Sequence, residues 1–454
     1  MRASVRIFFM KLLQFTSFYD ILLPSYEGMN LKKKEQFLMK KQPKRFDMYR
    51  KPIKARWWLR LAETVAGPVY MLFNKGHVKT EKAVRQLKGP YLILSSHASF
   101  MDFAQLMCGI WPRTTGWVMS VEEFRRGDWL MYGIGGMPKR KFTHGTVTVK
   151  HMLRYLRTLK MPVALYPEAR FALAGINERL DDALGKLCKH AKVPVVLFKA
   201  NGNFINSPQW SKHPYRRIRQ DAEISLLLTV EQLESMSAEE VQATIEKAFE
   251  RDEYAWQVEK GYHVKCKKRA DGLHSILYKC PVCGKEFDMK SEGIHLWCEA
   301  CGAKWEMDTL SRLHGVNTDK GFSHIPDWYR WEREEVRKEV QAGTYHFEDD
   351  VLVTDYYSTK VGFLDVGEAH VTHDENGFTF TGTVNGEPFN LNKPVSSMYS
   401  VHVEYNFLER GDAFDIATDD TSYFMFLKTA KNYLTKMHFA QEELYDHYVR
   451  KQTK

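Results

Sequence analysis

The stretch Leu94-Ser95-Ser96-His97-Ala98-Ser99-Phe100-Met101-Asp102 decides how this chain is read. It leaves an apolar run, Tyr91–Ser95, that is typical of a buried β-strand, and it enters a helical pattern over Met101–Ile110. Ser99 and Asp102 have the spacing of a capping box, which predicts that the helix begins at Ser99. His97 is therefore expected on the loop between a strand and a helix.

The same alternation of buried runs and helices continues on both sides of this stretch. It predicts an α/β fold with a mostly parallel sheet flanked by helices, over residues 75–255. The expected strands are Tyr91–Ser95, Thr115–Ser120, Val163–Tyr166, Val193–Lys199 and Glu223–Thr229. The expected helices are Met101–Ile110, Val121–Tyr132, Thr146–Leu159 and Ala238–Glu250.

His97 and Asp102 are the candidate catalytic residues. Inside one helix, an offset of five would turn them about 140° apart. With His97 outside the helix, Asp102 can accept from Nδ1 and leave Nε2 as a general base for an acceptor hydroxyl. The plainer interpretation is a capped helix beside an incidental histidine, and the same spacing recurs at His314 and Asp319. Amides at the helix start could hold an oxyanion or a phosphate.

Three downstream motifs distinguish the two pairs. The segment 97–102 (HASFMD) resembles the first motif, H-x-S-x-x-D, of the glycerolipid acyltransferases. Residues 135–140 (GGMPKR), 166–170 (YPEAR) and 193–196 (VPVV) resemble the second, third and fourth motifs of 1-acylglycerol-3-phosphate acyltransferases, in the same order. No comparable set follows His314. The resemblance covers roughly residues 75–210, about a third of the chain.

The motifs supply the predicted acceptor site. Gly135-Gly136 would allow close backbone approach, Arg140 offers a planar fork of donors, and Lys139 and Lys141 add charge, although a basic turn facing solvent would look the same. The resemblance implies that Arg140 and Arg170 bind the acceptor's phosphate and that Glu168 helps to build the site. The complete predicted substrate-binding set is Ser99, Gly136, Lys139, Arg140, Glu168 and Arg170.

The third motif departs from the family's usual P-E-G-T-R. Ala169 stands at the Gly position, Arg170 at the Thr position and Phe171 at the Arg position. A long guanidinium stem can cover a displacement of one residue, but Ala lacks the backbone freedom of Gly. The departure concerns the identity of the acceptor and leaves His97 and Asp102 untouched.

The N-terminal region, residues 1–74, is predicted to form basic amphipathic helices on a membrane surface. Residues 1–60 contain fifteen Lys and Arg against four Asp and Glu. Apolar side chains recur at helical spacing within Val5–Leu23 and again from Trp57 to Phe73. Anionic lipid is the expected partner, although a solvated tail or nucleic acid would suit the charge as well. Neither segment has the ~20 apolar residues of a span, and Lys11 interrupts any signal-peptide core, so we expect the cytoplasmic face of a membrane.

Two C-x-x-C pairs predict a structural zinc site in a ribbon over residues 274–312. The ligands are Cys280, Cys283, Cys298 and Cys301, and each pair is followed by a glycine that lets the backbone turn under the metal. A cytosolic redox pair is the alternative. Four thiolates leave no position for substrate. His274 and His295 are expected to be bystanders. The remaining cysteines do not suggest a disulfide framework and fit a reducing compartment.

Residues 340–454 are predicted to form a β-rich domain with a terminal helix. Asn376-Gly377 and Asn385-Gly386 signal hairpins, and Ala430–Arg450 has a helical apolar side. A small sheet closed by a helix resembles pleckstrin-homology or GRAM modules in shape only.

The predicted function is acyl transfer from acyl-CoA or acyl carrier protein to the free hydroxyl of a lysophospholipid, with 1-acylglycerol 3-phosphate as the leading acceptor. The alternatives are another lysophospholipid, glycerol 3-phosphate, or a non-catalytic lipid- or nucleic-acid-binding protein. Nucleic acid is disfavoured because the ribbon segment Lys279–Asp308 is nearly balanced in charge.

Overall fold

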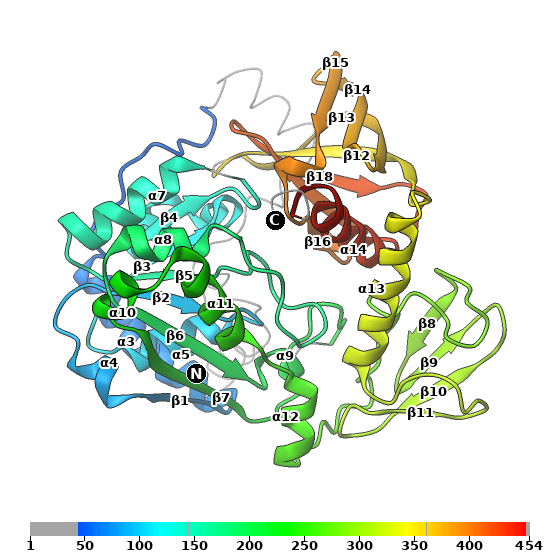
Figure 1. Ribbon diagram of the computed structural model, residues 1–454, viewed down its shortest axis with the longest axis horizontal. Coiled ribbons are helices and arrows are strands. Elements are labelled where there is room, and N and C mark those ends of the chain that lie inside the picture. Colours follow the sequence, from blue (N-terminus) through cyan, green and yellow to red (C-terminus); the bar gives the residue numbers. More distant parts are fainter. Residues whose placement is uncertain (1–43, 144, 214, 360, 451–454) are drawn as a thin grey trace, which may run out of the picture.

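A computed structural model describes residues 44–143, 145–213, 215–359 and 361–450. The predicted helix within Val5–Leu23 lies outside the described residues. The described chain forms three sheets that are connected in space by helices (Figure 1).

The first sheet has seven strands in the order β1-β7-β6-β2-β5-β3-β4. Within it, only the pairing of β6 with β7 is antiparallel, so the sheet is mixed and mostly parallel. The strands are β1 (Gly76–Thr80), β2 (Leu92–Ser95), β3 (Gly116–Ser120), β4 (Gly136–Lys139), β5 (Val163–Leu165), β6 (Val195–Asn201) and β7 (Gln220–Leu228). β2 lies in the centre and is buried along its whole length.

Helices cover this sheet on both faces, as the alternation in the sequence predicts. They are α3 (Trp57–Phe73), α4 (Lys82–Gln86), α5 (Met101–Gly109), η3 (Val121–Arg126), α6 (Asp128–Gly133), α7 (Thr146–Leu153), η4 (Arg154–Thr158), α8 (Leu184–Ala191), α9 (Asn203–Asn206), α10 (Val230–Ser235), α11 (Ala238–Phe249) and α12 (Glu253–Lys260). The predicted helix Val121–Tyr132 is divided into η3 and α6 by Gly127, whose φ of 114° no helix can contain.

Two edge strands, β1 and β4, were not predicted. β4 reads GMPK, and its proline is tolerated because the strand has a neighbour on one side only. β1 reads GHVKT and carries too few apolar residues to stand out as a strand.

The second sheet is the cysteine-bearing ribbon, with its antiparallel strands in the order β11-β10-β9-β8. Its elements are η5 (Leu273–Ser275), β8 (Met289–Glu292), β9 (His295–Cys298), β10 (Lys304–Met307) and β11 (Leu313–Gly315). Helix α13 (Ile325–Gln341), which was not predicted, then runs from the ribbon to the third sheet (Figure 1).

The third sheet is antiparallel and seven-stranded, in the order β15-β14-β13-β12-β18-β17-β16. Its elements are β12 (Phe347–Ser358), β13 (Gly362–Asp374), β14 (Gly377–Val384), β15 (Glu387–Lys393), η6 (Val395–Ser397), β16 (His402–Glu404), η7 (Phe407–Glu409), β17 (Ala413–Ala417), β18 (Ser422–Leu427), α14 (Leu434–Tyr445) and η8 (Asp446–Arg450). The further likeness to pleckstrin-homology or GRAM modules stays a prediction. We call residues 340–450 the C-terminal domain.

Residues 44–56 contain no helix and connect the first and third sheets. The amide of Phe46 donates to the carbonyl of Tyr357 at 3.2 Å, and Arg45 pairs with Asp355 at 3.0 Å. Farther along, the amide of Arg56 donates to the carbonyl of Gly133. The described segment 44–56 therefore contacts both the third sheet and the helices of the first sheet.

Candidate active site

His97 lies at the carboxyl end of the central strand β2, just before α5. Its Nδ1 is 3.2 Å from Oδ2 of Asp102. The imidazole lies between the rings of Tyr166 and Phe171, with centroids 4.1 Å away on both sides. Its side chain is 23% exposed, whereas that of Asp102 is fully buried. The ring is thus held at one nitrogen and on two faces, and its other edge is directed to the cavity described below.

Asp102 is fixed by four donors. Oδ2 accepts from the amides of Ala98 at 2.6 Å and Ser99 at 2.9 Å, as well as facing His97, and Oδ1 accepts from Nδ2 of Asn203 at 2.5 Å. An ionised carboxylate that accepts this many bonds is a strong, oriented acceptor for the imidazole. The arrangement is suited to holding one tautomer, with a proton on Nδ1 and a lone pair on Nε2.

The helix start differs in detail from the predicted capping box. α5 begins at Met101, two residues later than expected, and Oγ of Ser99 accepts from the amide of Met101 at 3.2 Å. The amide of Asp102 donates to the carbonyl of Ser99. Since the amides of residues 98, 99, 101 and 102 all have partners within the loop, we do not assign an oxyanion or a phosphate to them.

Glu168 is fully buried and pairs with Arg251 through two bonds, 2.7 Å to Oε1 and 2.9 Å to Oε2. The same carboxylate accepts from the amide of His97 at 3.0 Å. A bidentate pair of this kind fixes geometry as well as adding energy. Glu168, which the resemblance implies helps to build the acceptor site, therefore positions the His97 loop and does not line the cavity.

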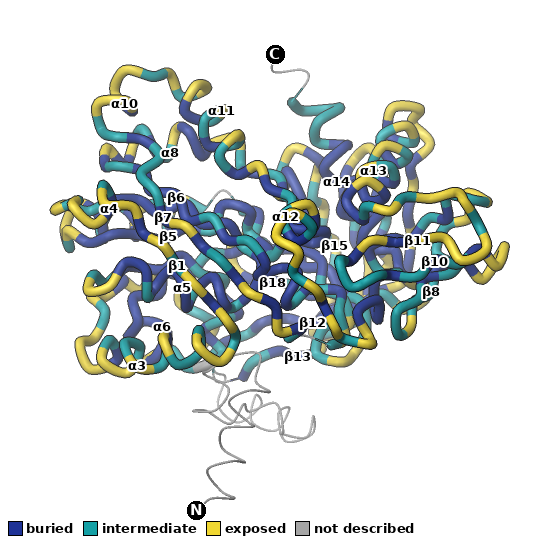
Figure 2. The backbone as a smooth tube through the Cα atoms, turned by 90° about the horizontal axis from the view of Figure 1, so that it is seen from below, coloured by how far each residue is buried: buried dark blue, intermediate teal, exposed yellow. Residues whose placement is uncertain are grey.

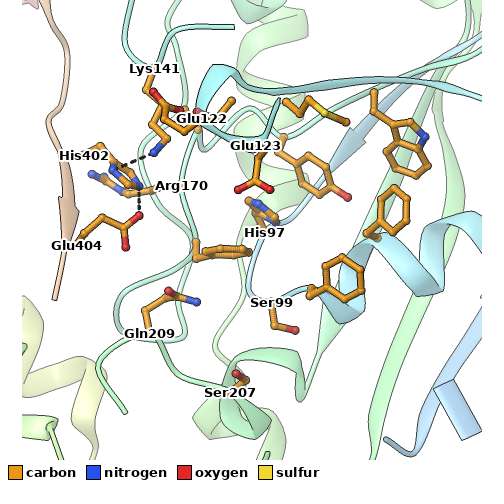
Figure 3. A pocket seen from close by; sticks show the side chains of 18 of the residues that line it. His97, Ser99, Glu122, Glu123, Lys141, Arg170, Ser207, Gln209, His402 and Glu404 are labelled. Atoms are coloured by element: carbon orange, nitrogen blue, oxygen red, sulfur yellow. Dashed lines mark hydrogen bonds and ion pairs between the residues drawn. The ribbon is translucent and has the colours of Figure 1, made fainter. Parts of the chain in front are cut away.

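A cavity of about 610 Å³ opens beside His97, a volume typical of ligand sites. One wall is apolar and aromatic and includes Phe100, Phe103, Trp117 and Tyr166. The opposite wall is polar and carries Glu122, Lys141, His402 and Glu404 (Figure 3). His402 and Glu404 belong to the C-terminal domain, so the cavity lies between two parts of the chain that are far apart in sequence.

The six predicted substrate-binding residues divide into two groups. Ser99, Lys139 and Arg170 line the cavity, whereas Gly136, Arg140 and Glu168 do not. The backbone at Gly136 does make a close approach, but to protein: an added Cβ would lie 2.6 Å from the carbonyl oxygen of Met131. Lys139 donates to the carbonyl of Thr143 at 3.0 Å from its place on the cavity wall.

Both arginines that the resemblance assigns to phosphate are bonded to the C-terminal domain. Arg140 donates to the carbonyl of Asp420 at 2.6 Å and to Oγ of Ser422 at 3.3 Å. Arg170 is buried and pairs with Glu442 at 2.6 Å and with Glu178 at 3.1 Å. A guanidinium with two buried carboxylate partners has little capacity left for a ligand, so in this structure these side chains join the two domains.

Several residues of the site have no motif in the sequence. Asn203, which follows β6, donates to Asp102, and Arg251, which follows α11, pairs with Glu168, which holds the His97 loop; the polar wall draws on β16. One signal was available for Asn203: it follows a predicted strand that is parallel to β2, and carboxyl ends of parallel strands share one edge of a sheet. No comparable signal connects residue 251 or 402 with residue 97.

The four predicted zinc ligands come together in the ribbon. Their sulfur atoms lie within 4.8 Å of one another, with 3.7 Å between Cys280 and Cys301 and 3.8 Å between Cys283 and Cys298. Four sulfurs about 2.3 Å from a tetrahedral zinc are about 3.8 Å apart, so the donor set fits the ion. Among the described residues this is the one such cluster, and neither His274 nor His295 belongs to it.

No protein-family model matches the chain, and no curated protein matches it. Among solved structures, it is similar to the crystal structure of the 1-acyl-sn-glycerophosphate (LPA) acyltransferase PlsC from Thermotoga maritima. Identity is 14%, the match covers 42% of this chain and 77% of that chain, and the TM-score is 0.34. A likeness this distant says nothing of activity, and we argue function from the geometry of the site.

Proposed function

We propose that the protein is an acyltransferase that moves a fatty acyl group from a thioester, acyl-CoA or acyl carrier protein, to the free hydroxyl of a lysophospholipid. The observation that carries this proposal is the imidazole of His97, held by Asp102 at Nδ1 and open at its other edge to a cavity with one apolar wall. A general base beside an apolar channel suits an acceptor that carries a long chain and a hydroxyl.

The reaction needs one proton carrier. His97 takes the hydroxyl proton on Nε2 while the oxygen attacks the thioester carbonyl, and Asp102 stabilises the imidazolium. Collapse of the tetrahedral intermediate breaks the C–S bond, and the proton passes from His97 to the thiolate that leaves. Zinc, held by the four cysteines of the ribbon, would have a structural role, because four protein ligands leave no position for substrate.

The leading acceptor remains 1-acylglycerol 3-phosphate, which would give phosphatidic acid. Lys139 and Arg125 line the cavity and can attract a phosphate by charge. A second candidate, another lysophospholipid, is favoured by the observation that Arg140 and Arg170 are bonded within the protein.

Helix α3 supports the proposal that the enzyme lies on a membrane. Its two charged residues, Arg60 and Glu63, face inward and pair with each other at 3.4 Å, with side chains only 13% and 14% exposed. Six of its large apolar residues are exposed instead, among them Trp57 at 74%, Val65 at 68% and Leu72 at 77%, while Leu59 packs into the core. Burial raises the pKa of Glu63 to about 7 although Arg60 lowers it.

This inverted helix forms an exposed apolar surface that extends to Trp129, which stacks on Trp58 with centroids 6.1 Å apart. Figure 2 shows α3 and α6 side by side at one end of the molecule. Exposed Lys54 and Arg56 stand beside this surface. Tryptophans flanked by cations suit the headgroup level of a bilayer. Within the described segments, no helix has the length and apolar character to cross a membrane.

The direct test is transfer of a labelled acyl group from acyl-CoA, and separately from acyl carrier protein, onto lysophosphatidic acid and other lysolipids in liposomes. We expect transfer by the wild type and a loss of at least about a thousandfold in His97→Ala, because the base acts on every turnover. His314→Ala is the matched control, since His314 faces Asp308 on the ribbon. Equal activity in wild type and His97→Ala would overturn the mechanism, and absence of transfer to every acceptor would overturn the proposed function.

A further inference from the structure

The polar wall of the cavity contains a cluster of ionisable groups that the proposed reaction does not use. Lys141 Nζ is 3.5 Å from Asp415 and 3.2 Å from Nδ1 of His402, and Nδ1 of His402 is itself 3.2 Å from Asp415. Nε2 of His402 is 3.5 Å from Glu404. Glu122 completes the cluster from η3 (Figure 3). The C-terminal domain thus supplies three of these five side chains.

Within the described part of the chain, this cluster is short of hydrogen-bond donors. Both carboxylate oxygens of Glu122 are buried and have no hydrogen-bond partner, and the residue is 7% exposed while lining the cavity. Three carboxylates, of Glu122, Glu404 and Asp415, stand with one lysine and one histidine, and the charge of Arg140 also acts on Glu122. Burial raises the pKa of Glu122, and the charge of Lys141 opposes that rise.

A buried carboxylate without a donor has lost its hydration without gaining a hydrogen bond in return, which is unfavourable. A ligand that brings N–H or O–H groups would remove this cost, whereas a phosphate would add like charge beside three carboxylates. The cluster therefore selects for hydrogen-bond donors and against a second anion. The polar wall and the aromatic wall line the same cavity as His97.

We propose that Glu122, His402 and Glu404 form a head-group subsite that binds a hydrogen-bond-donating group, an ammonium or a hydroxyl, carried by the acyl acceptor beyond its phosphate. This inference rests on the proposed function and, within it, favours the second candidate, another lysophospholipid, over 1-acylglycerol 3-phosphate. It makes the C-terminal domain a determinant of acceptor choice, and it predicts that the preferred acceptor is larger than lysophosphatidic acid. The phosphate of such an acceptor would lie nearer to Lys139 than to Glu122.

The test compares four acceptors with the same acyl chain. Lysophosphatidylethanolamine offers an ammonium, lysophosphatidylglycerol offers hydroxyls, lysophosphatidylcholine has a cation without N–H or O–H donors in its head group, and lysophosphatidic acid has no head group. We expect kcat/KM for the ethanolamine or the glycerol lipid to exceed that for the choline lipid by at least about tenfold, the value of one good hydrogen bond to a charged group. The lipid with the higher kcat/KM shows whether the subsite prefers an ammonium or a hydroxyl.

Glu122→Gln should reduce this preference about tenfold, through a higher KM for the donor-bearing lipids. Glu404→Gln, on the other side of the cluster, should act in the same direction and serves if the first variant folds poorly. Glu234→Gln, an exposed glutamate on α10, is the matched control. Equal or better use of the choline lipid or of lysophosphatidic acid by the wild type, or a preference unchanged in both subsite variants, would overturn the inference.

Equilibrium binding of the same four lipids to the His97→Ala protein, followed by the fluorescence of Trp117 on the cavity wall, separates the two proposals. Absence of acyl transfer to any lipid, together with selective binding of donor-bearing head groups, would reject the enzyme and retain the subsite. Acyl transfer without selective binding would reject the subsite and retain the enzyme.

Discussion

Phe171 and Tyr166 hold the plane of the His97 ring between them. Both aromatic centroids are 4.1 Å from that of the imidazole, at interplanar angles of 38° and 33°. The bond to Asp102 fixes one nitrogen but leaves the ring able to swing about it, and the two aromatic faces prevent that motion. Phe171, which stands where the family pattern has arginine, thus supports the proposed catalytic base.

Replacing Phe171 with Ala should therefore lower kcat about 10- to 100-fold, since small displacements of a reacting group cost that much. Phe171→Tyr, which keeps the ring, should restore most of the activity. Steady-state kinetics would show the loss in kcat and a KM changed by less than about threefold. A rise in KM without a fall in kcat would instead indicate that Phe171 contacts the acceptor.

Ala169 adopts a φ of 57°, in the left-handed region that favours glycine. Its amide donates to the carbonyl of Tyr166 at 3.1 Å, which closes a turn directly before Arg170 and Phe171. This conformation strains alanine by about 1–2 kcal/mol in the folded state. Glycine would avoid the strain, but it would lose about 0.4–1 kcal/mol of stability because its unfolded chain has more conformational freedom.

Ala169→Gly should consequently raise the free energy of unfolding by up to about 1 kcal/mol, and Ala169→Val should lower it by about 2 kcal/mol or more, because a β-branched residue tolerates this region least. Denaturant unfolding monitored by circular dichroism would check both. A glycine variant less stable than the wild type would show that the turn in solution differs from the one described.

At the scale of the element, helix α3 exposes its apolar face and buries its charges. Membrane binding through this face should weaken at least about tenfold in the double variant Trp57→Ser, Leu61→Ser, since each large apolar side chain contributes on the order of 1–3 kcal/mol on burial. Co-sedimentation with liposomes containing anionic lipid would measure it. Val316→Ser, another exposed apolar position but on the ribbon, is the control. Unchanged binding in the double variant would remove α3 from the membrane contact.

The elements that the sequence did predict are those with a strong period or a buried run. β2 and β6 have continuous apolar runs, and α11 has both a regular stripe and a capping box at Ser237 and Glu240. Helix α13 was missed although Trp328, Glu332, Val336 and Val340 follow one another at helical spacing on its buried side, because a charged residue interrupts the stripe. Glu332 accepts from the amide of Lys279 at 2.7 Å, a partner that only the fold supplies.

The site divides in the same way. The pairing of His97 with Asp102 could be predicted from the sequence because the two residues are five positions apart at the start of one helix. The partners of Arg140 and Arg170 in the C-terminal domain lie 230 or more residues away, and no local pattern marks them. The motif resemblance implied that these arginines bind a phosphate. The motifs do not cover the C-terminal domain, so they contain no information about the partners that it supplies.

At the scale of the whole molecule, one hydrophobic cluster joins the ribbon, the C-terminal domain and the back of the catalytic loop. It includes Cys280 of the ribbon, Phe347 of the third sheet, and Ala98 and Ala172 beside the active site. The amide of Ala172 donates to the carbonyl of His97 at 2.9 Å. A change in one unit can therefore reach His97, the proposed catalytic base, through packed atoms.

The buried Arg170–Glu442 ion pair also joins the catalytic domain to the C-terminal domain. Burial alone would raise the pKa of Glu442, but His438, Arg333 and Arg170 together bring it well below its ordinary value. Because the folded-state pKa is depressed, the stabilising effect is fully present above about pH 4.5 and is lost as pH falls from there through the lower folded value.

Glu442→Gln should lower the free energy of unfolding by about 3–5 kcal/mol at neutral pH, because it leaves buried cations without their partner, and it should flatten the acid limb of the stability profile. Activity should fall as well, since Arg170 adjoins Phe171. Glu443→Gln is the matched control, because Glu443 pairs with Arg333 and Arg337 but has no contact with Arg170. If both variants lose the same activity, the effect belongs to α14 as a whole and not to the link with the catalytic loop.

The ribbon reaches α14, and through it the active site, by two further bonds. Lys436 pairs with Glu286 at 2.7 Å, and Oγ1 of Thr435 donates to the carbonyl of Ser275 at 2.6 Å. A four-cysteine site of this kind holds its ribbon folded through the metal, because the strands are too short to bury a core alone. Loss of zinc should release the ribbon and with it the packing beneath α14.

We therefore expect a chelator to lower the thermal midpoint and acyl transfer in parallel, although no cysteine of the site lines the cavity at His97. Metal analysis should give about one zinc per chain before treatment, and the four ribbon thiols should react with a thiol reagent only afterwards. Added zinc should restore both properties, which excludes general damage by the chelator. Full activity at an unchanged midpoint in metal-free protein would show that the ribbon is held without the metal, by its hydrophobic contacts around Cys280 and Cys298 and by its bonds to α14.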